Sequence, residues 1–532
     1  MIEKIKKINY VRLLIIIFLT INLIFPLIMI FTNIFSSGIG SVYKSKIFIS
    51  ALKNSITYTV IATFISIGLA YLLAFLINRS TIRFKAIFTI LLTIPMLIPS
   101  ISHGTGLLVL FGRNGFLTNL LNLNFNIQGF SGLIIGSVMY SFPVALIMFT
   151  DIFSYEDKTL YEAADVLGIP KTSQFTNITM GYITKPLITV ILAVFTMIFT
   201  DYGVPMMVGG TTTSLPLFMY QEVVGLMNYG KGVAIGLILL VPAVIGFILD
   251  LVFKKEVSTN NAGQTEVKVN KVFNVTSYIV IGIVTTLILL PIISFVFLTF
   301  IKKFPIDLTF TFSNIIKSFE MNAGRYLFNS ILVSVIVSII GMIVSYLTAY
   351  TTTRTKSKSN NFVHLISILS LAIPGILLGL SYVMFFNSTF IYNTFIILVI
   401  VNIIHFFGSP YIMAYNAMNK MNENYENVAQ SLGIPRYRLI LDVFIPANKN
   451  TILEMISYFF VNSMITISAV SLLTTSGTKL LSLLINDFEI IQLTEGAAFV
   501  SLLILSINLI IKGTVYIIKR RGYKNEIKQE SI

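Results

Sequence analysis

Few residues in the apolar stretches of this sequence could bind a ligand or drive chemistry, and Asp201 stands out among them. It lies in the run FTDYGVPMMVGG, at the end of a stretch long enough to cross a membrane. A carboxylate inside a membrane helix costs about 2.5–3.5 kcal/mol on insertion scales, which indicates a water-lined path or a partner for Asp201. The alternative is that Asp201 ends a helix in the interfacial layer of the membrane.

Two other patterns that could hold a metal ion or a nucleotide are weak. The three histidines, His103, His364 and His405, have no paired spacing that would form a metal site, and a lone His103 is typical of hydrogen-bonded packing. The stretch GLMNYGKG approaches the phosphate-binding pattern G-x-x-x-x-G-K-[ST], but Gly232 cannot supply the hydroxyl that holds magnesium. With no cysteine and no intramembrane cluster of His, Asp or Glu, the sequence predicts no catalytic residue, no metal site and no directly bound cofactor.

A short polar cassette occurs twice, as EAADVLGIPK from Glu162 and as NVAQSLGIPR from Asn427. Each copy predicts a short helix that ends at a glycine, because glycine tolerates the positive φ common at helix ends. A proline then suits the first position of a second helix, where its missing N–H would have no partner. We therefore predict two elbow-shaped protrusions, in which small alanine side chains let a partner approach closely. The residues that define the turns are Gly168, Pro170, Gly433 and Pro435.

The elements that position these residues are membrane-spanning helices. Hydrophobic residues make up 55% of the 532 residues, charged residues only 11%, and the mean hydropathy is +0.87. The apolar runs are continuous rather than alternating, so they predict helices of about 20 residues and not a barrel. The fold class is therefore an all-α polytopic membrane protein with about twelve spans. They are expected near residues 11–34, 54–78, 86–111, 132–152, 184–206, 232–253, 273–300, 328–353, 362–386, 391–418, 451–475 and 495–518.

Charge predicts the orientation of these spans. With both termini in the cytoplasm, most of the 37 lysines and arginines lie on the cytoplasmic side, as the positive-inside rule requires. The net charge of +15 then reflects topology and anionic headgroups rather than nucleic acid. The first apolar run is too long for a signal peptide and is expected to stay as an uncleaved span. Both cassettes fall in cytoplasmic connections between the fourth and fifth spans of a half.

An internal repeat divides the chain into two parallel six-helix halves. We expect halves at 1–253 and 273–518, a polar cytoplasmic linker at 254–272, a basic tail at 519–532, and elbow-bearing loops at 154–181 and 419–446. The landmark pairs are Pro26 and Pro291 at an offset of 265, Asn54 and Asn329 at 275, Pro95 and Pro374 at 279, Pro143 and Pro410 at 267, and Gly168 and Gly433 at 265.

At the cassettes the chain resembles the membrane permeases of binding-protein-dependent ABC importers, whose signature is the EAA motif. Copy one matches at Glu162, Ala163, Ala164, Gly168 and Ile178, and copy two matches at Ala429, Gly433 and Pro446. Copy two departs from the motif at Asn427, which leaves Glu426, one position early, as the possible acid. The resemblance implies a type I importer permease fold and coupling to an ATPase through Glu162, Ala163, Ala164, Gly168, Pro170, Glu426, Ala429, Gly433 and Pro435.

The same resemblance implies partners and a substrate class. The partners would be a dimer of cytoplasmic ABC ATPase subunits, which use the ATP and Mg, and an extracytoplasmic solute-binding protein, all at the bacterial inner membrane. The span-five regions are similar to those of the iron(III), 2-aminoethylphosphonate and thiamine branch, so the substrate is expected to be iron(III), a small phosphonate or thiamine. By that similarity Asp201, Tyr202, Thr466 and Ser468 line the substrate path.

A secondary, ion-coupled or facilitating twelve-span transporter is the alternative. Such a carrier also has two parallel six-span halves, but it is expected to carry a basic loop with Gly and Asp between spans two and three. Here that loop reads INRSTIRFK, with neither residue. A membrane enzyme is not expected, since the sequence offers no cluster of catalytic groups.

Overall fold

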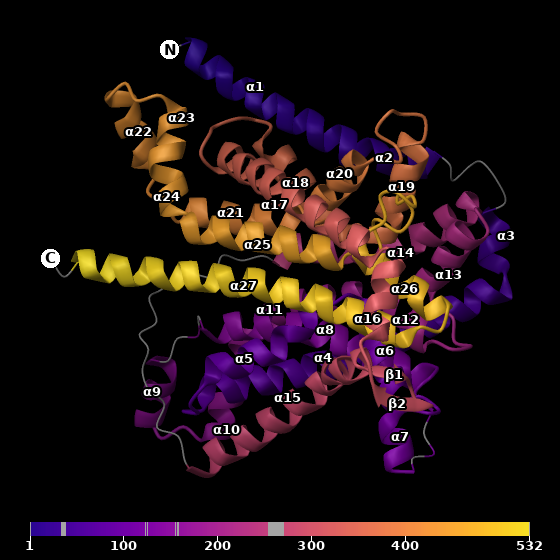
Figure 1. Ribbon diagram of the computed structural model, residues 1–532. Coiled ribbons are helices and arrows are strands. Elements are labelled where there is room, and N and C mark those ends of the chain that lie inside the picture. The colour runs from indigo at the N-terminus through magenta and orange to yellow at the C-terminus, as the bar shows by residue number, and fades with distance from the viewer. Residues whose placement is uncertain are drawn as a thin grey trace.

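The computed structural model describes residues 2–32, 39–122, 124, 126–154, 156, 159–253 and 271–530. The predicted linker at 254–272 lies outside the described residues except for its last two positions. Helices dominate the described chain, which confirms the predicted all-α polytopic class (Figure 1). Both termini lie at one end of the molecule, called here the terminal end; the opposite end is called the far end.

Among the described residues, seven helices are long and apolar enough to cross a membrane by themselves. The first of them runs over Tyr10–Thr32 as α1, a π-helical turn and α2. The elements of this group are α1 (Ile2–Leu19), α2 (Phe25–Thr32), α4 (Lys46–Arg79), α8 (Phe130–Ser154), α14 (Tyr229–Phe253), α15 (Lys271–Thr299), α17 (Ala323–Thr353) and α27 (Thr494–Glu530).

Four further spans are helix pairs bent at a short break, which brings the number of spans to as many as eleven. The two sharpest bends, 101° and 111°, lie in the third predicted span of each half. The helices of these pairs are α5 (Lys85–Thr93), α6 (Ser100–Phe111), α10 (Lys171–Gln174), α11 (Met180–Thr200), α18 (Asn360–Leu369), α19 (Gly375–Phe386), α20 (Phe395–His405) and α21 (Gly408–Asn419).

The prediction of a helical span over 451–475 is wrong at its end. Helix α25 (Lys449–Ile465) has 17 residues, and the chain leaves the helix at Thr466. The segment that follows is rich in Ser, Thr and Gly, which compete with or weaken helical hydrogen bonding. The span predicted at 184–206 likewise ends early, at Thr200, because the Asp201 carboxylate accepts a hydrogen bond from the Val204 N–H at 2.9 Å and starts a new helix.

The remaining helices are short, and a single two-stranded antiparallel hairpin is found in the described chain. Strands β1 (Ile301–Lys303) and β2 (Asp307–Phe310) pair with Ile301 opposite Phe310. The short helices are α3 (Ile39–Lys44), α7 (Phe116–Leu120), α9 (Thr159–Val166), α12 (Gly203–Val208), α13 (Leu215–Tyr220), α16 (Ser313–Glu320), α22 (Asn424–Ser431), α23 (Arg436–Leu439), α24 (Ile445–Ala447) and α26 (Leu481–Ile490).

The first span of each half packs against the other half. Helices α1 and α2 contact α17, α18 and α19, and α15 contacts α4, α5 and α6 (Figure 1). A hydrogen bond joins each first span to the opposite half. Tyr382 donates to the Asn22 carbonyl at 2.6 Å, and the Arg83 N–H donates to the Tyr278 hydroxyl at 2.6 Å. The two sequence halves therefore interlock in space.

The structure corrects one pair of repeat landmarks. Pro374 precedes α19 at the break of its span, and the proline in the same place before α6 is Pro99, not Pro95. The offset between Pro99 and Pro374 equals that between Asn54 and Asn329. Pro95 instead lies one turn earlier, inside a short 3₁₀ turn. Both inner helices are broken at these prolines, with the chain bent by 101° at Pro99 and by 111° at Pro374.

Candidate functional site

The first elbow is the turn between α9 and α10. The Gly168 N–H donates to the Asp165 carbonyl at 3.1 Å, and the Ile169 N–H reaches back to the Ala164 carbonyl at 2.9 Å. This pair of bonds is the Schellman arrangement that closes a helix C-terminus. It needs a left-handed residue, and Gly168 has φ of +67°.

The second elbow, between α22 and α23, repeats this backbone geometry. The Gly433 N–H donates to the Gln430 carbonyl at 3.2 Å, the Ile434 N–H donates to the Ala429 carbonyl at 2.8 Å, and Gly433 has φ of +70°. The predicted positive φ of both glycines is confirmed. Each proline lies one position earlier than predicted: Pro170 and Pro435 precede the first helical residue instead of occupying it.

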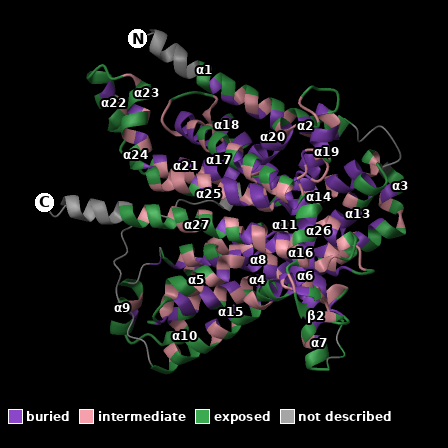
Figure 2. Cartoon of the chain, in the orientation of Figure 1, coloured by how far each residue is buried: buried purple, intermediate pink, exposed green. Residues whose placement is uncertain are grey.

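Both elbows present apolar side chains to the outside at the terminal end of the molecule (Figure 2). Leu167 is 75% exposed and its counterpart Leu432 is 69% exposed. Glu162 and Ala163 are also exposed, whereas Ala164 and Ala429 are buried under their own helices. An exposed apolar cluster at a tight turn outside the spans is typical of a surface that a partner covers.

The first elbow is tied to the bundle by Arg79, the last residue of α4. The Arg79 Nη2 lies 2.7 Å from the Glu156 Oε2, and both side chains are largely buried. The guanidinium also lies over the Tyr161 ring, with 4.1 Å from Cζ to the ring centroid, a distance that permits a cation–π interaction. The Tyr161 hydroxyl bonds to both Glu156 and Thr179, so α9 is held at its first turn.

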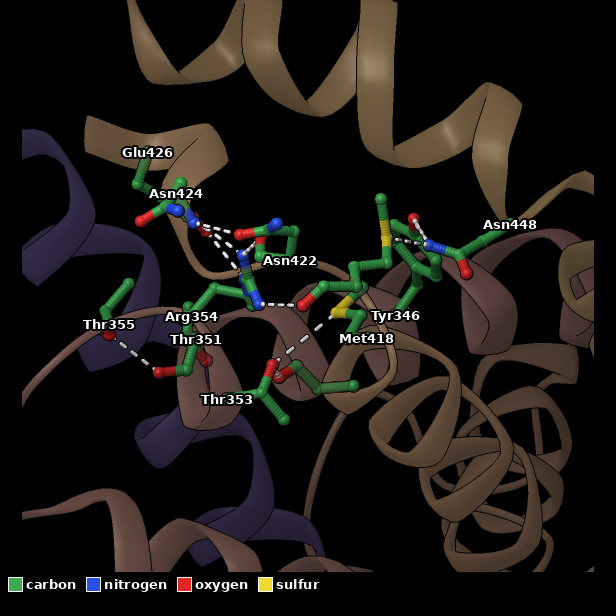
Figure 3. Close-up of polar contacts among 12 residues, drawn as sticks. Tyr346, Thr351, Thr353, Arg354, Thr355, Met418, Asn422, Asn424, Glu426 and Asn448 are labelled. Carbon is green, nitrogen blue, oxygen red and sulfur yellow. Dashed lines mark hydrogen bonds and ion pairs between the residues drawn. The ribbon is translucent and has the colours of Figure 1, made fainter. Parts of the chain in front are cut away.

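The second elbow is tied by Arg354, directly after α17 (Figure 3). Its Nε and Nη2 bind the two Glu426 carboxylate oxygens at 2.6 and 2.7 Å, a bidentate pair. The same guanidinium donates to the carbonyls of Met421 at 3.1 Å and Asn422 at 2.7 Å. The Glu426 carboxylate is therefore engaged inside the chain, and a contact of Glu426 with an ATPase stays a prediction.

Sequence reasoning missed both arginines and Glu156. A signal was present, since Arg79 and Arg354 are separated by the same offset as Asn54 and Asn329. The cassettes follow the shorter offset of their glycines, so Tyr161 corresponds to Glu426 and Glu156 corresponds to Met421. The anchoring acid thus occupies different positions in the two loops, which hid the shared role.

Two groups of the first elbow have shifted pKa values. Hydrogen bonds from Lys171 and Gln174 lower the pKa of Asp165 below its ordinary value, and Lys171 Nζ lies 2.6 Å from Asp165 Oδ1. Burial, with the hydrogen bond to Glu156, raises the pKa of Tyr161 to about 12. Tyr161 therefore stays neutral at physiological pH, while Asp165 stays ionised and keeps its ion pair with Lys171 across the turn.

The predicted path residues lie at the ends of α11 and α25. Asp201 directly follows α11 and Thr466 directly follows α25, both with extended backbone, and their separation equals that of Gly168 and Gly433. The two breaks meet across the halves: a Cβ placed on Gly203 would lie 2.8 Å from Ile467 Cδ1. The structure thus brings the two segments together, and Asp201 is a helix-end residue whose carboxylate caps α12.

The other two predicted path residues belong to the same junction. Tyr202 is buried and stacks on Tyr220 with ring centroids 4.7 Å apart. Ser468 packs on Gly375 at the start of α19, next to the His405 ring. Contact of Asp201, Tyr202, Thr466 or Ser468 with a substrate stays a prediction, because the geometry shows their place and not a ligand.

His103 and the lysine of the phosphate-loop pattern both have neighbours within the chain. His103 is buried with its ring 6.0 Å from the Tyr140 ring. Lys231 pairs with Glu222 at 3.2 Å, so its ammonium is engaged within the chain. In the part of the chain that the structure describes, no group of three or more His, Cys, Asp or Glu side chains could hold a metal ion.

Comparison with known proteins assigns a family to this arrangement. The sequence profile described as "Binding-protein-dependent transport system inner membrane component" matches residues 66–259 and 341–522. The chain belongs to this family. The two matched segments begin at equivalent points of the two halves and each contains one elbow, which confirms the resemblance seen in the cassettes.

Relatives of the permease include fused and single-half proteins. This chain is 22% identical over 485 residues to the putative ferric transport system permease protein FbpB 1 of Haemophilus influenzae, and the alignment covers 86% of this chain and 76% of that protein. It is 22% identical over 486 residues to the ferric transport system permease protein FbpB of Actinobacillus pleuropneumoniae, covering 86% and 70%. The molybdenum transport system permease protein ModB of H. influenzae is 28% identical over 180 residues, 32% of this chain and 79% of ModB.

The permease is therefore the membrane component of an ABC importer, and not an enzyme or a secondary carrier. ModB aligns with about a third of the chain, whereas the two FbpB proteins align along most of it. The long alignments agree with a permease in which both halves are fused in one polypeptide.

Proposed function

We propose that this permease carries iron(III) across the bacterial inner membrane, driven by a separate ATPase dimer that docks on the elbows at α9 and α22. The observation that supports coupling is the duplicated elbow. Both copies have the same backbone turn and exposed apolar tips, and each is tied by an arginine to the end of a long span. Force applied to either tip would pass through α4 or α17 into the bundle.

The proposed orientation places both termini and both elbows in the cytoplasm. The basic residues of the sequence favour this side, and the elbows lie at the terminal end in the structure (Figure 1). ATP and Mg would be bound by the ATPase, and an extracytoplasmic binding protein would deliver the substrate at the far end. Closure of the ATPase dimer would draw the elbows together and open the path toward that end.

Iron(III) is proposed because the two long alignments are to proteins named as ferric transport permeases. 2-Aminoethylphosphonate and thiamine are the competing substrates. The proposed path runs through the junction of Asp201, Tyr202, Thr466 and Ser468, where the two halves meet.

Uptake in a deletion strain tests the substrate. Cells lacking the chromosomal gene are complemented with the permease and given radioactive iron(III), 2-aminoethylphosphonate or thiamine in separate arms. Restored uptake of iron alone supports the proposal, whereas restored uptake of one of the others assigns that substrate instead. Co-purification of an ATPase with the wild-type chain, and its loss in a Leu167→Asp/Leu432→Asp variant, tests the docking surface separately.

A further inference from the structure

The segment between α15 and α17 carries an unusual apolar surface. Phe300, Phe310 and Phe312 form a ring cluster, with centroids 5.7 Å apart for Phe300 and Phe310 and 5.2 Å apart for Phe310 and Phe312. Phe310 is nevertheless 70% exposed, and Ile306 at the turn is also exposed. Rings that pack on one another but remain uncovered indicate that something outside the chain completes the cluster.

Helix α16 has the opposite polarity to that expected of a helix in contact with water. Its polar residues Asn314 and Ser318 are buried, and they donate hydrogen bonds to the Ile301 carbonyl at 2.5 Å and to the Asn314 carbonyl at 2.7 Å. Its apolar residues Ile316 and Phe319 are 57% and 49% exposed. A water-facing amphipathic helix turns its apolar stripe to the core, so the exposed side of α16, which also carries Lys317 and Glu320, is suited to a boundary between apolar and polar surroundings.

This surface continues the lipid-facing sides of two spans. On α15, Ile293, Val296 and Phe297 are exposed up to the start of the hairpin, and on α17 Phe328 is exposed just after α16. Phe297 also packs on Phe116 of α7, with ring centroids 6.2 Å apart, so the apolar surface reaches α7. Continuity with span surfaces favours lipid over a protein partner.

The polar groups of the hairpin match a headgroup layer. Lys302 pairs with Asp307 at 2.9 Å across the two strands, and Thr309 donates to the same carboxylate. The charges of Lys302 and Asp307 are therefore paired within the hairpin. Lys317 is exposed on α16. Aromatic and apolar side chains beside lysines are typical of segments that lie in the membrane interface.

We propose that the hairpin β1–β2 and α16 lie in the membrane interface of the far-end leaflet, with Phe310, Phe312, Ile316 and Phe319 inserted among the acyl chains. This arrangement would anchor the far ends of α15 and α17 at a fixed depth. Because α15 packs against the first half, the same anchor would set the depth of both halves. The inference goes beyond substrate transport and does not depend on the proposed ATPase coupling.

Tryptophan fluorescence tests this placement directly, since the natural chain contains no tryptophan. Single variants Phe310→Trp and Ile316→Trp of the full chain are placed in phosphatidylcholine and phosphatidylglycerol vesicles, with and without bromine on the acyl chains. Phe297→Trp on α15 is the lipid-facing control, and Leu167→Trp on the first elbow is the water-facing control. Leu308→Trp replaces Phe310→Trp if that variant does not fold.

The expected result is blue-shifted emission and quenching of both test variants by at least about half the loss seen for Phe297→Trp, strongest with bromine near the glycerol end. Emission that stays red-shifted and unquenched, as for Leu167→Trp, would overturn the proposal. A shift caused by adding the solute-binding protein, without bromine quenching, would also overturn it and assign the surface to protein docking. None of these readouts uses uptake or ATP hydrolysis, so failure here leaves the coupling proposal separately testable.

Discussion

The two elbows of the permease have the same backbone and different anchors. In the first, Arg79 pairs with a buried acid from outside α9 and lies over the ring of Tyr161. In the second, the position of Tyr161 is taken by Glu426, which binds Arg354 directly. Repeated halves thus preserved the turn and the arginine while the acid changed place, which indicates that the tether matters more than the residue that makes it.

Removal of the second arginine should cause the largest loss of function. Arg354→Ala deletes two bonds to Glu426 and two to main-chain carbonyls, and it leaves a partly buried carboxylate without its partner. Loss of one member of a buried pair costs about 3–5 kcal/mol, so we expect α22 to detach and uptake to fall at least about tenfold. Hydrogen exchange over 424–431 and substrate uptake measure the two effects.

Arg354→Lys is the matched control, and we expect it to retain part of the uptake because one ammonium can still reach the acid. Arg79→Ala should be the milder of the two alanine variants, since Arg79 has one ion pair and one ring contact in the described chain. Equal or greater damage from Arg79→Ala would contradict the ranking drawn from the contacts.

The shared backbone is tested at the glycines. Gly168→Val and Gly433→Val place a β-branched residue at positive φ, which costs about 1–2 kcal/mol per site. In the part of the chain that the structure describes, no neighbouring atom lies within 4 Å of a Cβ at either position, so the strain would come from the backbone. The double variant should remain in the membrane and lose ATP-driven uptake, whereas Gly→Asn at both sites should be tolerated. Normal uptake by the double valine variant would remove the elbows from the mechanism.

Exchange of the anchoring residues tests whether the two tethers are equivalent. Glu156→Met/Tyr161→Glu gives the first loop the residues of the second, so the new acid should bind Arg79. We expect the double variant to transport better than Glu156→Met alone, with a coupling energy of about 1 kcal/mol or more in a double-mutant cycle. Purely additive losses in uptake and in the free energy of unfolding would show that the two anchors are not interchangeable.

The smallest expected effect is a pH dependence, because the first turn is held by the titrating carboxylate of Asp165 and the second is not. Lys171 and Gln174 lower the pKa of Asp165. The contact of these residues with the carboxylate therefore stabilises the turn fully above the ordinary carboxyl pKa of about 4, and this stabilisation is lost as pH falls through the lowered pKa. Its counterpart in the second loop is Gln430, which does not titrate. Acid should therefore lower the hydrogen-exchange protection factors at 165–174 and not at 430–439, and Asp165→Asn should remove that difference.

Much of the fold followed from local patterns. Apolar runs of span length gave the helical class, and the LGIP cassettes gave both glycine turns, because a left-handed helix end is a local requirement. The ends of spans five and eleven were less predictable. Asp201 and Thr466 stop their helices through capping and Ser- and Thr-rich sequence, which a hydropathy pattern does not register.

The candidate site likewise has some features that depend on local sequence and others that depend on tertiary contacts. The sequence alone determined which residues form the elbows, since each turn depends on bonds between neighbours in the chain. Only the tertiary structure decided that Arg79 and Arg354 hold them, that each half takes its first span from across the bundle, and that Gly203 meets Ile467 at the junction of the halves. Such contacts join residues that are far apart in the chain, and their partners are selected by packing and charge rather than by spacing.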